Sequence, residues 1–484
     1  ERLATLWRIH SGTVDVVLDA LLCGLRANDV PLDKSDAALC SDLKAASVVT
    51  VQDALKALCL HSGGCEVVVR DSDQLMKRLK QAAEDKKGSL WLKLCAGTYE
   101  IPEDLSLSGL TSLRLSGESA AASQIIVGAQ RLRWQAGEIV LEDLGWTFKQ
   151  PAAQLGLQFN RGARLVFDKV NASGGVGGAQ IELRALDDGY EPERCRLNTE
   201  RFLSDDVFAL FGYVGTPTTL AALPLLTSAK VPLIAPLTGA MGLRNPFNRN
   251  VFHIRASYED ETALIVKHLT QLGLKKIGVF RQNDSYGQAG LDGVTKALQS
   301  RQLSPVAVGT VERNSSDVAA AVKTLTAARP DAIVLISAYG SCAAFIRAAR
   351  QAGYGGTFFN VSFVGTQALS DALGPDARGV MVTQVVPSPF STTSGIVRDY
   401  LAALKAADPK LKPNYTSLEG YIAARVLVDG LSRGGRGRDG LVSGLEGLGT
   451  LQLGGFPLSF SARDHVGSHF VEITMLTGDG GVRT

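Results

Sequence analysis

Hydroxyl-bearing residues gather at the end of an apolar stretch near the middle of the sequence. Residues 207–211 (VFALF) predict a buried strand, and the segment GYVGTPTT that follows contains the glycines and the proline that end a strand and begin a helix. We expect Thr216 to be the N-cap and Pro217 to be the first helical residue. The Thr216 hydroxyl and the free N–H groups of Thr218 and Thr219 would then face an anion, which the helix dipole favours. The stretch therefore predicts a site for a small carboxylate, although a well-capped helix in any α/β protein would have the same pattern.

Other combinations of reactive side chains give no sign of catalysis. The six histidines are scattered, and the pair His465 and His469 encloses Gly467 and has strand-like flanks, which favours a loop over a metal-binding helix. The sequence has no nucleophile elbow, phosphate-binding loop or CxxC redox motif, and GGVGG at 174–178 is typical of a helix-ending turn. We expect no catalytic residue, no metal ion and no cofactor.

The composition is that of a globular chain with two or three domains. Its 484 residues are 45% hydrophobic and 20% charged, with a formal net charge of +2. The near-neutral charge argues against a nucleic-acid partner, and we interpret the basic segment SRGGRGRDG at 432–440 as a solvated turn. No apolar run reaches the roughly 18 residues that a membrane helix needs, so we expect no membrane span. The first residues also lack the order of a signal peptide.

The periodicity of apolar residues divides the chain into three parts. Residues 1–64 place apolar residues three and four positions apart, which predicts a small helical cap. Residues 65–150 contain short β-rich runs separated by tight turns, which predict a winding β segment. In residues 151–484 strands alternate with helices in two successive series, and this pattern predicts an α/β fold with two doubly wound lobes of parallel sheet.

The strands predicted for the two lobes are continuous apolar or alternating runs. In the first lobe they are QIELRALDD (180–188), VFALFG (207–212), VPLIAP (231–236) and VFHIRA (251–256). In the second lobe they are KKIGVF (275–280), VAVGTVE (306–312), DAIVLIS (331–337), TFFNVSF (357–363) and GVMVTQVV (379–386). The helix predicted before the first strand keeps Leu155, Phe159, Ala163, Val166, Phe167 and Val170 on one face.

The β-rich part carries a first resemblance. CAGTYEIPEDLSLSGLTSLRLSG at 95–117, followed by AGEIVLEDLGWTF at 136–148, resembles the opening coils of a right-handed parallel β-helix of the pectate-lyase-like type. Such folds often act on polysaccharides through clustered carboxylates, but the acidic residues of this stretch have no spacing that would pair them. We interpret the segment as a structural or attachment module.

Residues 151–484 carry a second and more extensive resemblance. The stretches AAQLGLQFNRGARLVFDKVNASGG, FALFGYVGTPTTLAALPLL, VPLIAPLTGA and QNDSYGQAGLDGV follow one another in the order found in the type I periplasmic solute-binding proteins of the branched-chain amino-acid family, which this region closely resembles. The resemblance implies two lobes joined by three crossovers, with lobe 1 at about 151–272 plus a C-terminal return and lobe 2 at about 273–386. It also implies capture of a small carboxylate or amino acid for an ABC permease, and a periplasmic location.

The resemblance further implies which strand-end residues face the ligand between the lobes. These positions are Thr216, Thr218, Leu237, Thr238, Gly239, Tyr286 and Tyr339, with Tyr213 and Tyr258 as further candidates near the rim. Thr216 would hold the ligand carboxylate, and Tyr286 and Tyr339 would close over it from the second lobe. The alternative for each of these side chains is ordinary packing at a strand end.

Two stretches depart from the family pattern. Family members that bind aliphatic amino acids hold the ammonium with an acidic residue after the fourth strand of lobe 2, whereas this chain has NVSFVG at 360–365. An unpaired buried ammonium is costly, so the ligand could be a carboxylate whose other end is uncharged or aromatic. The family also opens lobe 1 with a strand and a Gly-Gln-Ser loop, where this chain has EIVLEDLGWTFKQP at 138–151. The same residues cannot belong fully to a β-helix coil and to the central sheet of lobe 1.

Two other functions stay open from the sequence. A carbohydrate-active β-helix protein would explain residues 65–148 alone. A ligand sensor or scaffold with no transport role would explain the fusion of the parts, but it needs a transducing helix or an anchor that the sequence does not display.

Overall fold

A computed structural model describes residues 66–69, 72–85, 89–94, 97–101, 105–117, 123–127, 132–142, 145–148, 153–435 and 437–483. The chain divides into two compact units, residues 1–150 and 151–484. The helical cap predicted at 1–64 lies outside the described residues. Among the helices of the described part, none is long and apolar enough to cross a membrane.

The first unit pairs short strands into two parallel sheets. Its elements are β1 (Glu66–Val69), α5 (Ser72–Asp85), β2 (Ser89–Leu94), β3 (Gly97–Ile101), β4 (Leu105–Gly117), β5 (Ser123–Val127), β6 (Leu132–Glu142) and β7 (Gly145–Phe148). From β2 to β7 the strands alternate between the sheet β1-β2-β4-β6 and the sheet β3-β5-β7. Buried Tyr99 donates its hydroxyl to the Val69 carbonyl at 2.8 Å. The chain therefore winds as expected, and membership of the pectate-lyase-like family stays a prediction.

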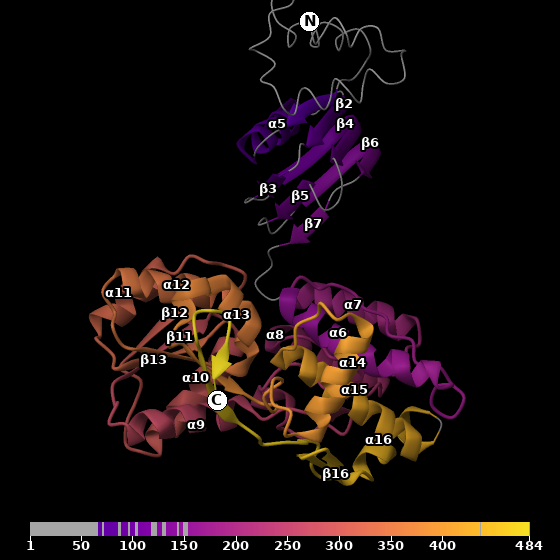
Figure 1. Ribbon diagram of the computed structural model, residues 1–484, viewed down its shortest axis with the longest axis vertical. Helices are drawn as coiled ribbons and strands as arrows, with labels where there is room; N and C mark the ends of the chain where they lie inside the picture. The colour runs from indigo at the N-terminus through magenta and orange to yellow at the C-terminus, as the bar shows by residue number, and fades with distance from the viewer. Residues whose placement is uncertain are drawn as a thin grey trace, which may run out of the picture. The chain divides into compact units, whose positions relative to one another are not determined.

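The second lobe of the unit 151–484 is a parallel sheet covered on both faces (Figure 1). Its elements are α9 (Tyr258–Gln271), β11 (Ile277–Gln282), α10 (Ser285–Gln299), β12 (Ala307–Val311), α11 (Ala319–Ala327), β13 (Ala332–Ile336), α12 (Tyr339–Gln351), β14 (Thr357–Asn360), η4 (Ser362–Val364), α13 (Thr366–Leu373), η5 (Gly374–Ala377), β15 (Met381–Gln384), β18 (Glu472–Leu476) and β19 (Val482–Arg483). The order is β12-β11-β13-β14-β15-β18-β19, and only β18 and β19 are antiparallel to their neighbours. Val279 and Val334 pack in the cluster of α9 and α10, whereas Phe280 and Leu335 pack in that of α11 and α12. Burial on both faces explains why these strands are continuous apolar runs.

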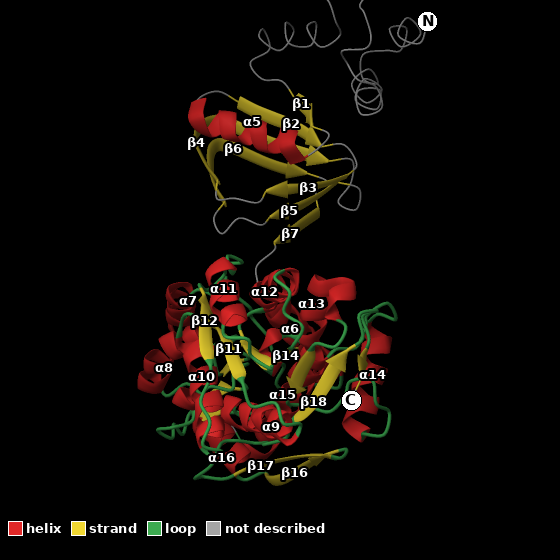
Figure 2. Ribbon diagram, turned by 90° about the vertical axis from the view of Figure 1, so that its left-hand side faces the viewer, coloured by secondary structure: helices red, strands yellow, loops and turns green. Residues whose placement is uncertain are grey.

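The first lobe has a smaller sheet, and its helices are among those drawn in red in Figure 2. Its elements are α6 (Ala153–Ala172), α7 (Pro192–Ser204), β8 (Leu210–Phe211), α8 (Thr216–Ala229), β9 (Leu233–Ile234), η3 (Met241–Leu243), β10 (Val251–Phe252), α14 (Gly395–Ala407), α15 (Tyr415–Gly434), α16 (Arg438–Glu446), β16 (Gly449–Leu453) and β17 (Phe456–Phe460). The three parallel strands have the order β10-β9-β8. Helices α6 and α15 touch along their length, and a Cβ on Gly420 would lie 2.1 Å from the Phe159 carbonyl oxygen. The apolar face predicted for α6 is confirmed, since Leu155, Phe159 and Ala163 are buried.

The strand predicted at QIELRALDD is wrong. Residues 180–188 are irregular, and residues 180–187 make no backbone-to-backbone hydrogen bond to the described chain. A strand needs a partner, and the sheet of the first lobe ends at β8. Residues 139–142, which stand where the family has its first strand, pair instead with residues 113–116 of β4. Residues 139–142 are therefore not available as a partner strand for residues 180–188, which stay irregular.

The crossover from the first to the second lobe lies earlier in the chain than expected. Helix α9 packs on α10 and against β15, so the chain changes lobe at residues 253–257 rather than near 272. It returns to the first lobe after β15 and leaves it again before β18. The crossovers lie side by side, because the His253 N–H donates to the His465 carbonyl at 2.8 Å.

Candidate functional site

The turn after β8 brings two threonine hydroxyls together. Gly215, with φ 96°, is the N-cap of α8, so the expectation that Thr216 is the N-cap is wrong by one residue. The turn requires a positive φ, which glycine adopts without the steric penalty that threonine would have. Thr216 Oγ1 lies 2.6 Å from Thr238 Oγ1, and both side chains are buried. The two loops predicted to bind a carboxylate therefore meet through these hydroxyls.

The residues beside Thr216 have internal hydrogen-bond partners. The Thr218 hydroxyl donates to the carbonyls of Val214 and Gly215, the second at 3.1 Å. The Thr219 N–H donates to the Gly215 carbonyl at 3.2 Å, so the expectation that this N–H is free is wrong. The Thr218 hydroxyl is thus used within its own turn, whereas the Thr216 hydroxyl contacts Thr238 in the loop after β9.

The loop after β9 is held against the second lobe. The Gly239 carbonyl accepts a hydrogen bond from the Tyr258 N–H at 2.8 Å, and a Cβ on Gly239 would lie 2.6 Å from the Tyr258 ring. The Leu237 N–H donates to the Tyr213 carbonyl at 2.7 Å, so it is not a free donor. Arg244 donates from Nη1 to the Ala240 carbonyl at 2.9 Å and fixes the same loop.

Four aromatic rings form a continuous series beside these loops. Tyr258 and Tyr286 have ring centroids 5.4 Å apart, Tyr286 and Phe363 4.7 Å, and Phe363 and Tyr190 5.9 Å. The Tyr286 hydroxyl is buried and has no hydrogen-bond partner among the described residues, whereas the buried Tyr258 hydroxyl interacts with Thr238. Burial raises the pKa of Tyr258 to about 12 and raises the pKa of Tyr286 well above its usual value. Both phenols are therefore neutral hydrogen-bond donors at neutral pH.

The series closes on the threonine turn. A Cβ on Gly215 would lie 2.2 Å from the Tyr190 ring, so this glycine lies against the last ring of the series. The resulting circle of contacts, which we call the interlobe ring, consists of Tyr190, Gly215, Thr216, Thr238 and Gly239 from the first lobe and Tyr258, Tyr286 and Phe363 from the second.

Two predicted tyrosines pack elsewhere. The Tyr213 hydroxyl lies 2.9 Å from Thr199 Oγ1, and its ring packs against the apolar cluster that contains Leu210 and Leu226. The structure therefore places Tyr213 outside the interlobe ring. Tyr339 begins α12 and packs against the apolar cluster of α11 and α12. Its contact with a ligand stays a prediction.

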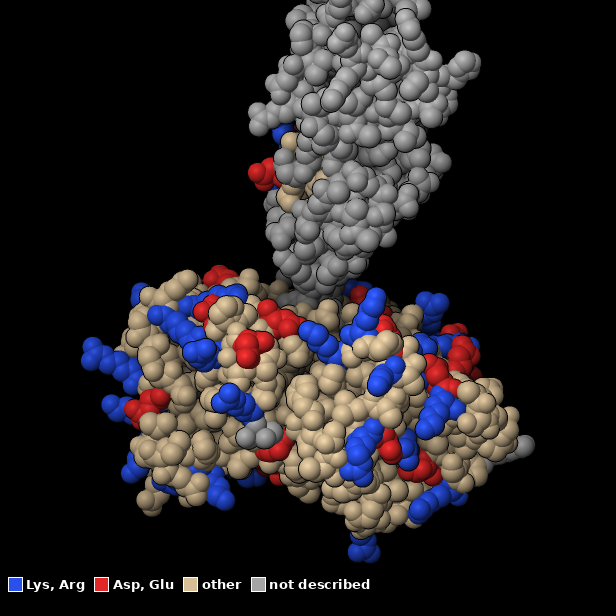
Figure 3. Space-filling view, in the orientation of Figure 1, with Lys and Arg blue, Asp and Glu red and all other residues tan. Residues whose placement is uncertain are grey.

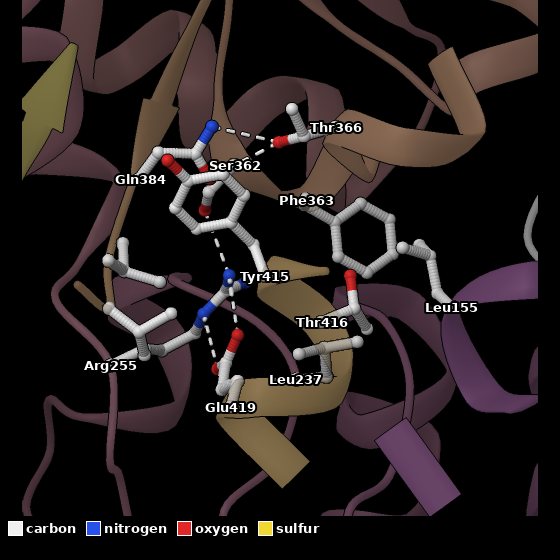
Figure 4. A pocket seen from close by; sticks show the side chains of 12 residues that line it. Leu155, Leu237, Arg255, Ser362, Phe363, Thr366, Gln384, Tyr415, Thr416 and Glu419 are labelled. Atoms are coloured by element: carbon white, nitrogen blue, oxygen red, sulfur yellow. Dashed lines mark hydrogen bonds and ion pairs between the residues drawn. The ribbon is translucent and has the colours of Figure 1, made fainter. Parts of the chain in front are cut away.

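A small cavity adjoins the interlobe ring at Leu237 and Phe363 (Figure 4). Its volume is about 10 Å³, which is room for about one water molecule. The lining comes from both lobes and the crossovers: Leu155, Leu237, Arg255, Ser362, Phe363, Thr366, Gln384, Val385, Val386, Tyr415, Thr416 and Glu419. The lobes are thus in contact around a nearly filled space.

A buried ionic cluster borders this cavity. Arg255 Nε lies 3.0 Å from Glu419 Oε1, and Arg255 Nη2 donates to Ser362 Oγ at 2.8 Å (Figure 4). Glu261 accepts from the Ser362 N–H at 2.7 Å and from the hydroxyls of Ser362 and Thr383. Burial raises the pKa of Glu261 and of Glu419, although Arg255 opposes the shift of both. The charge of the Arg255 guanidinium therefore stabilises two buried carboxylates, Glu261 of the second lobe and Glu419 of the first.

The segment NVSFVG has the composition noted in the sequence, and the structure shows its contacts. Asn360 Nδ2 donates to the Met381 carbonyl at 3.2 Å, Ser362 binds Glu261, and Phe363 joins the interlobe ring. The carboxylate in contact with this segment comes from Glu261 of α9. Its two oxygens already accept from one backbone N–H and two hydroxyls.

A second set of polar contacts, made by buried and partly buried side chains, joins the lobes. The Tyr190 hydroxyl accepts from Gln282 Nε2 at 3.1 Å, and Arg313 lies 2.9 Å from Glu191 and 3.5 Å from Asp284. Residues 190–191 belong to the first lobe, and the other three belong to the second. We call these five residues the latch.

Metal-binding and nucleic-acid features are not evident in the described part of the chain. It contains no group of three or more His, Cys, Asp or Glu placed to hold a metal ion. His465 stacks on Phe252 with centroids 3.7 Å apart, and His469 lies 3.2 Å from Asp260. On the face in Figure 3 the basic and acidic side chains of residues 151–484 are interspersed. Arg438 of the basic segment is bound to Asp206 at 2.6 Å.

Comparison with known proteins gives the family of the chain. Residues 146–481 match the family model described as periplasmic binding protein. The chain belongs to the periplasmic binding protein family. This is a family of substrate-binding proteins, which are not enzymes.

Solved structures similar to this periplasmic binding protein cover nearly the same region. A possible leucine/isoleucine/valine-binding protein from Rhodopirellula baltica is 36% identical with a TM-score of 0.66, over 69% of this chain and 93% of its own. A substrate-binding periplasmic protein from Ralstonia solanacearum is 31% identical with a TM-score of 0.64, over 68% of this chain and 95% of its own. Both support the type I fold expected for residues 151–484.

A curated relative is more distant. The Leu/Ile/Val-binding protein homolog 3 from Brucella melitensis is 22% identical over 291 residues, which is 59% of this chain and 76% of the relative. The proteins named here are binding proteins, and they give no support to the resemblance of residues 95–148 to a β-helix.

Proposed function

We propose that this periplasmic binding protein captures a small carboxylate or amino-acid ligand between its two lobes in the periplasm and delivers it to an ABC importer. The observation that carries the proposal is the interlobe ring, in which the hydroxyls of Thr216, Thr238 and Tyr258 lie together and the buried Tyr286 hydroxyl lacks a partner among the described residues. These four hydroxyls come from both lobes, as a site that closes on its ligand requires.

The ring suits a carboxylate for a physical reason. A buried hydroxyl without a partner costs roughly 1–3 kcal/mol, and an acceptor that enters the site would remove this cost. Ionised acceptors make shorter and stronger hydrogen bonds than neutral ones. Because the tyrosine hydroxyls stay protonated around neutral pH, they can donate a hydrogen bond to such an acceptor.

The remainder of the ligand would face the rings of Tyr190, Tyr286 and Phe363. Aromatic walls favour an apolar or aromatic group. An ammonium would need a carboxylate, and Glu261 and Glu419 are already bound to Ser362, Thr383 and Arg255. We therefore expect a carboxylate without an ammonium to bind more tightly than the matching amino acid, although two similar proteins are named for binding leucine, isoleucine and valine.

A thermal-shift screen of small carboxylates, each paired with its neutral amide, tests the proposal. A ligand that binds the folded state must raise the midpoint of unfolding, so carboxylates should shift it and their amides should not. The pair 3-phenylpropionate and phenylalanine, which differ by the ammonium, decides between the two ligand classes. Absence of stabilisation by any carboxylate or amino acid would contradict the proposal.

A further inference from the structure

A pocket of about 730 Å³, which we call the crossover pocket, lies where two crossovers between the lobes meet β17. Part of its lining comes from the segment 387–394, which leads from β15 back to the first lobe, and part from the segment 464–472, which leads on to β18. It shares no lining residue with the cavity beside the interlobe ring. Sites for small molecules typically have volumes of about 300–1,000 Å³, so this pocket has room for a ligand of its own.

The charged side chains that line the crossover pocket are acidic. Asp464 and Glu472 line it, and no Lys or Arg is among its described lining residues. His469 also lines it, but this side chain is 67% exposed and its Nδ1 lies 3.2 Å from Asp260 Oδ2. The charge of the pocket therefore favours a cation over an anion.

Glu472 is a carboxylate in need of a partner. It is partly buried, and its Oε1 is shielded from solvent and has no hydrogen-bond partner among the described residues. The Tyr415 hydroxyl, which lies near Glu472, interacts with Ser388. Burial raises the pKa of Glu472. Because burying a carboxylate without a donor is costly, a cationic donor that enters the pocket would remove this cost.

Several hydroxyl groups of the lining already have partners within the chain. The Ser391 and Thr393 hydroxyl oxygens lie 2.8 Å apart, and Ser394 Oγ donates to the Gly454 carbonyl at 3.0 Å. These hydroxyls need a ligand less than Glu472 does. The pocket therefore suits an amine better than a sugar.

Three phenylalanine rings supply an apolar surface in the same pocket. Phe456 and Phe460 are buried residues of β17, and Phe470 packs edge-on against Phe456 with ring centroids 5.7 Å apart. All three line the pocket. Aromatic rings accept the hydrocarbon part of a ligand, and their faces attract a cation.

We infer that the crossover pocket binds a small organic amine, whose ammonium donates to Glu472 and whose hydrocarbon part contacts the three phenylalanine rings. The charge of this ligand is opposite to that of the carboxylate expected at the interlobe ring. The inference therefore concerns a second site with its own ligand class, and it does not depend on the proposed function.

Isothermal calorimetry on the full chain with 2-phenylethylamine near neutral pH tests the inference. The control ligand is 2-phenylethanol, which has nearly the same size and the same ring but no charge. We expect saturable binding of the amine with a Kd of roughly 1 mM or below, and at least 10-fold weaker binding of the alcohol.

Two variants locate the amine. Glu472→Gln keeps the shape of the side chain and removes its charge, so it should weaken amine binding at least 10-fold. Ser459→Trp fills the pocket from an exposed position of β17 and should weaken binding through loss of space. The matched control is Asp168→Asn, since Asp168 is an exposed carboxylate of α6 that does not line the pocket. Its Kd should be unchanged.

Four results would overturn the inference. The first is no binding of 2-phenylethylamine at concentrations up to roughly 10 mM, and the second is equal binding of the alcohol. The third is an unchanged Kd in Glu472→Gln. The fourth is loss of amine binding in Thr216→Val, which would place the amine at the interlobe ring. A negative result in the carboxylate screen leaves these measurements unaffected, because the two sites have different lining residues.

Discussion

Arg255 is the residue on which the buried charges between the lobes depend. Its guanidinium neutralises Glu419 directly and reaches Glu261 through Ser362. Burial alone would lower the pKa of Arg255, but Glu419 and Glu261 outweigh this effect and raise it. The cluster therefore keeps its guanidinium charged at every pH at which the protein folds.

Arg255→Met should destabilise the protein strongly. Removal of one partner of a buried ion pair leaves an uncompensated charge and costs roughly 3–5 kcal/mol. Urea unfolding of the two proteins measures the difference. The matched control is Lys296→Met, because Lys296 pairs with Glu259 on the surface at 2.7 Å and such pairs contribute at most about 1 kcal/mol. Equal losses in the two variants would show that the Arg255 cluster contributes no more than a surface pair.

Which hydroxyl-bearing residues meet between the lobes can be predicted from the sequence better than which charged residues do. Thr216, Thr238, Tyr258 and Tyr286 were accessible to prediction because each follows a strand, and they meet in the interlobe ring. Arg255, Glu261 and Glu419 are 164 positions apart at their extremes and have no local pattern. The signal that could have found them is a charged residue inside an otherwise apolar run, as at Arg255 in VFHIRA.

At the scale of elements, the latch connects a loop of the first lobe to the ends of strands in the second. Arg313 bonds to Glu191 across the lobes and to Asp284 within its own lobe. Tyr190 takes part in both the latch and the interlobe ring. A change in the latch should therefore alter closure without touching a ligand.

Arg313→Met should weaken ligand binding through the closed state. Loss of the ion pair between Arg313 and Glu191, which joins the lobes, lowers the population of that state, and we expect the Kd to rise roughly 3- to 10-fold. Calorimetry measures the Kd, and small-angle scattering measures the opening. Arg347→Met removes a surface pair with Asp376 inside one lobe and serves as the control. A Kd unchanged in Arg313→Met would remove the latch from closure.

Element types were more predictable than element partners. Four of the five parallel strands of the second lobe lie within predicted runs, and β11 extends two residues beyond its run. Each strand has a neighbour in the sheet. The run at 180–188 has the same alternation but no strand beside it, so it is irregular. Strand pairing depends on residues far away in the chain, so the local alternation of apolar residues does not predict it.

At the scale of the whole molecule, stability should depend on pH through buried His253. Burial lowers its pKa well below the usual value, and its Nε2 donates to the Leu243 carbonyl at 3.1 Å. Below about pH 6.5 the unfolded chain binds a proton at this histidine and the folded protein does not. Its contribution to stability is therefore present above that pH and is lost as the pH falls.

His253→Gln should flatten this part of the pH profile. The wild type should lose up to about 1.4 kcal/mol more per pH unit than the variant between roughly pH 6.5 and 5. Urea unfolding at several pH values gives both curves. Parallel curves over this range would show that His253 does not titrate on unfolding.

The central claim is that the two lobes hold a carboxylate at Thr216. Isothermal calorimetry on Thr216→Val, with the carboxylate that gives the largest thermal shift, tests it most directly. The control is Thr219→Val, whose buried hydroxyl donates to the Gly215 carbonyl within the same helix turn. We predict that Thr216→Val weakens binding at least 10-fold, which corresponds to about 1.4 kcal/mol, and that Thr219→Val leaves the Kd unchanged. An unchanged Kd in Thr216→Val, or an equal loss in both variants, would contradict the account.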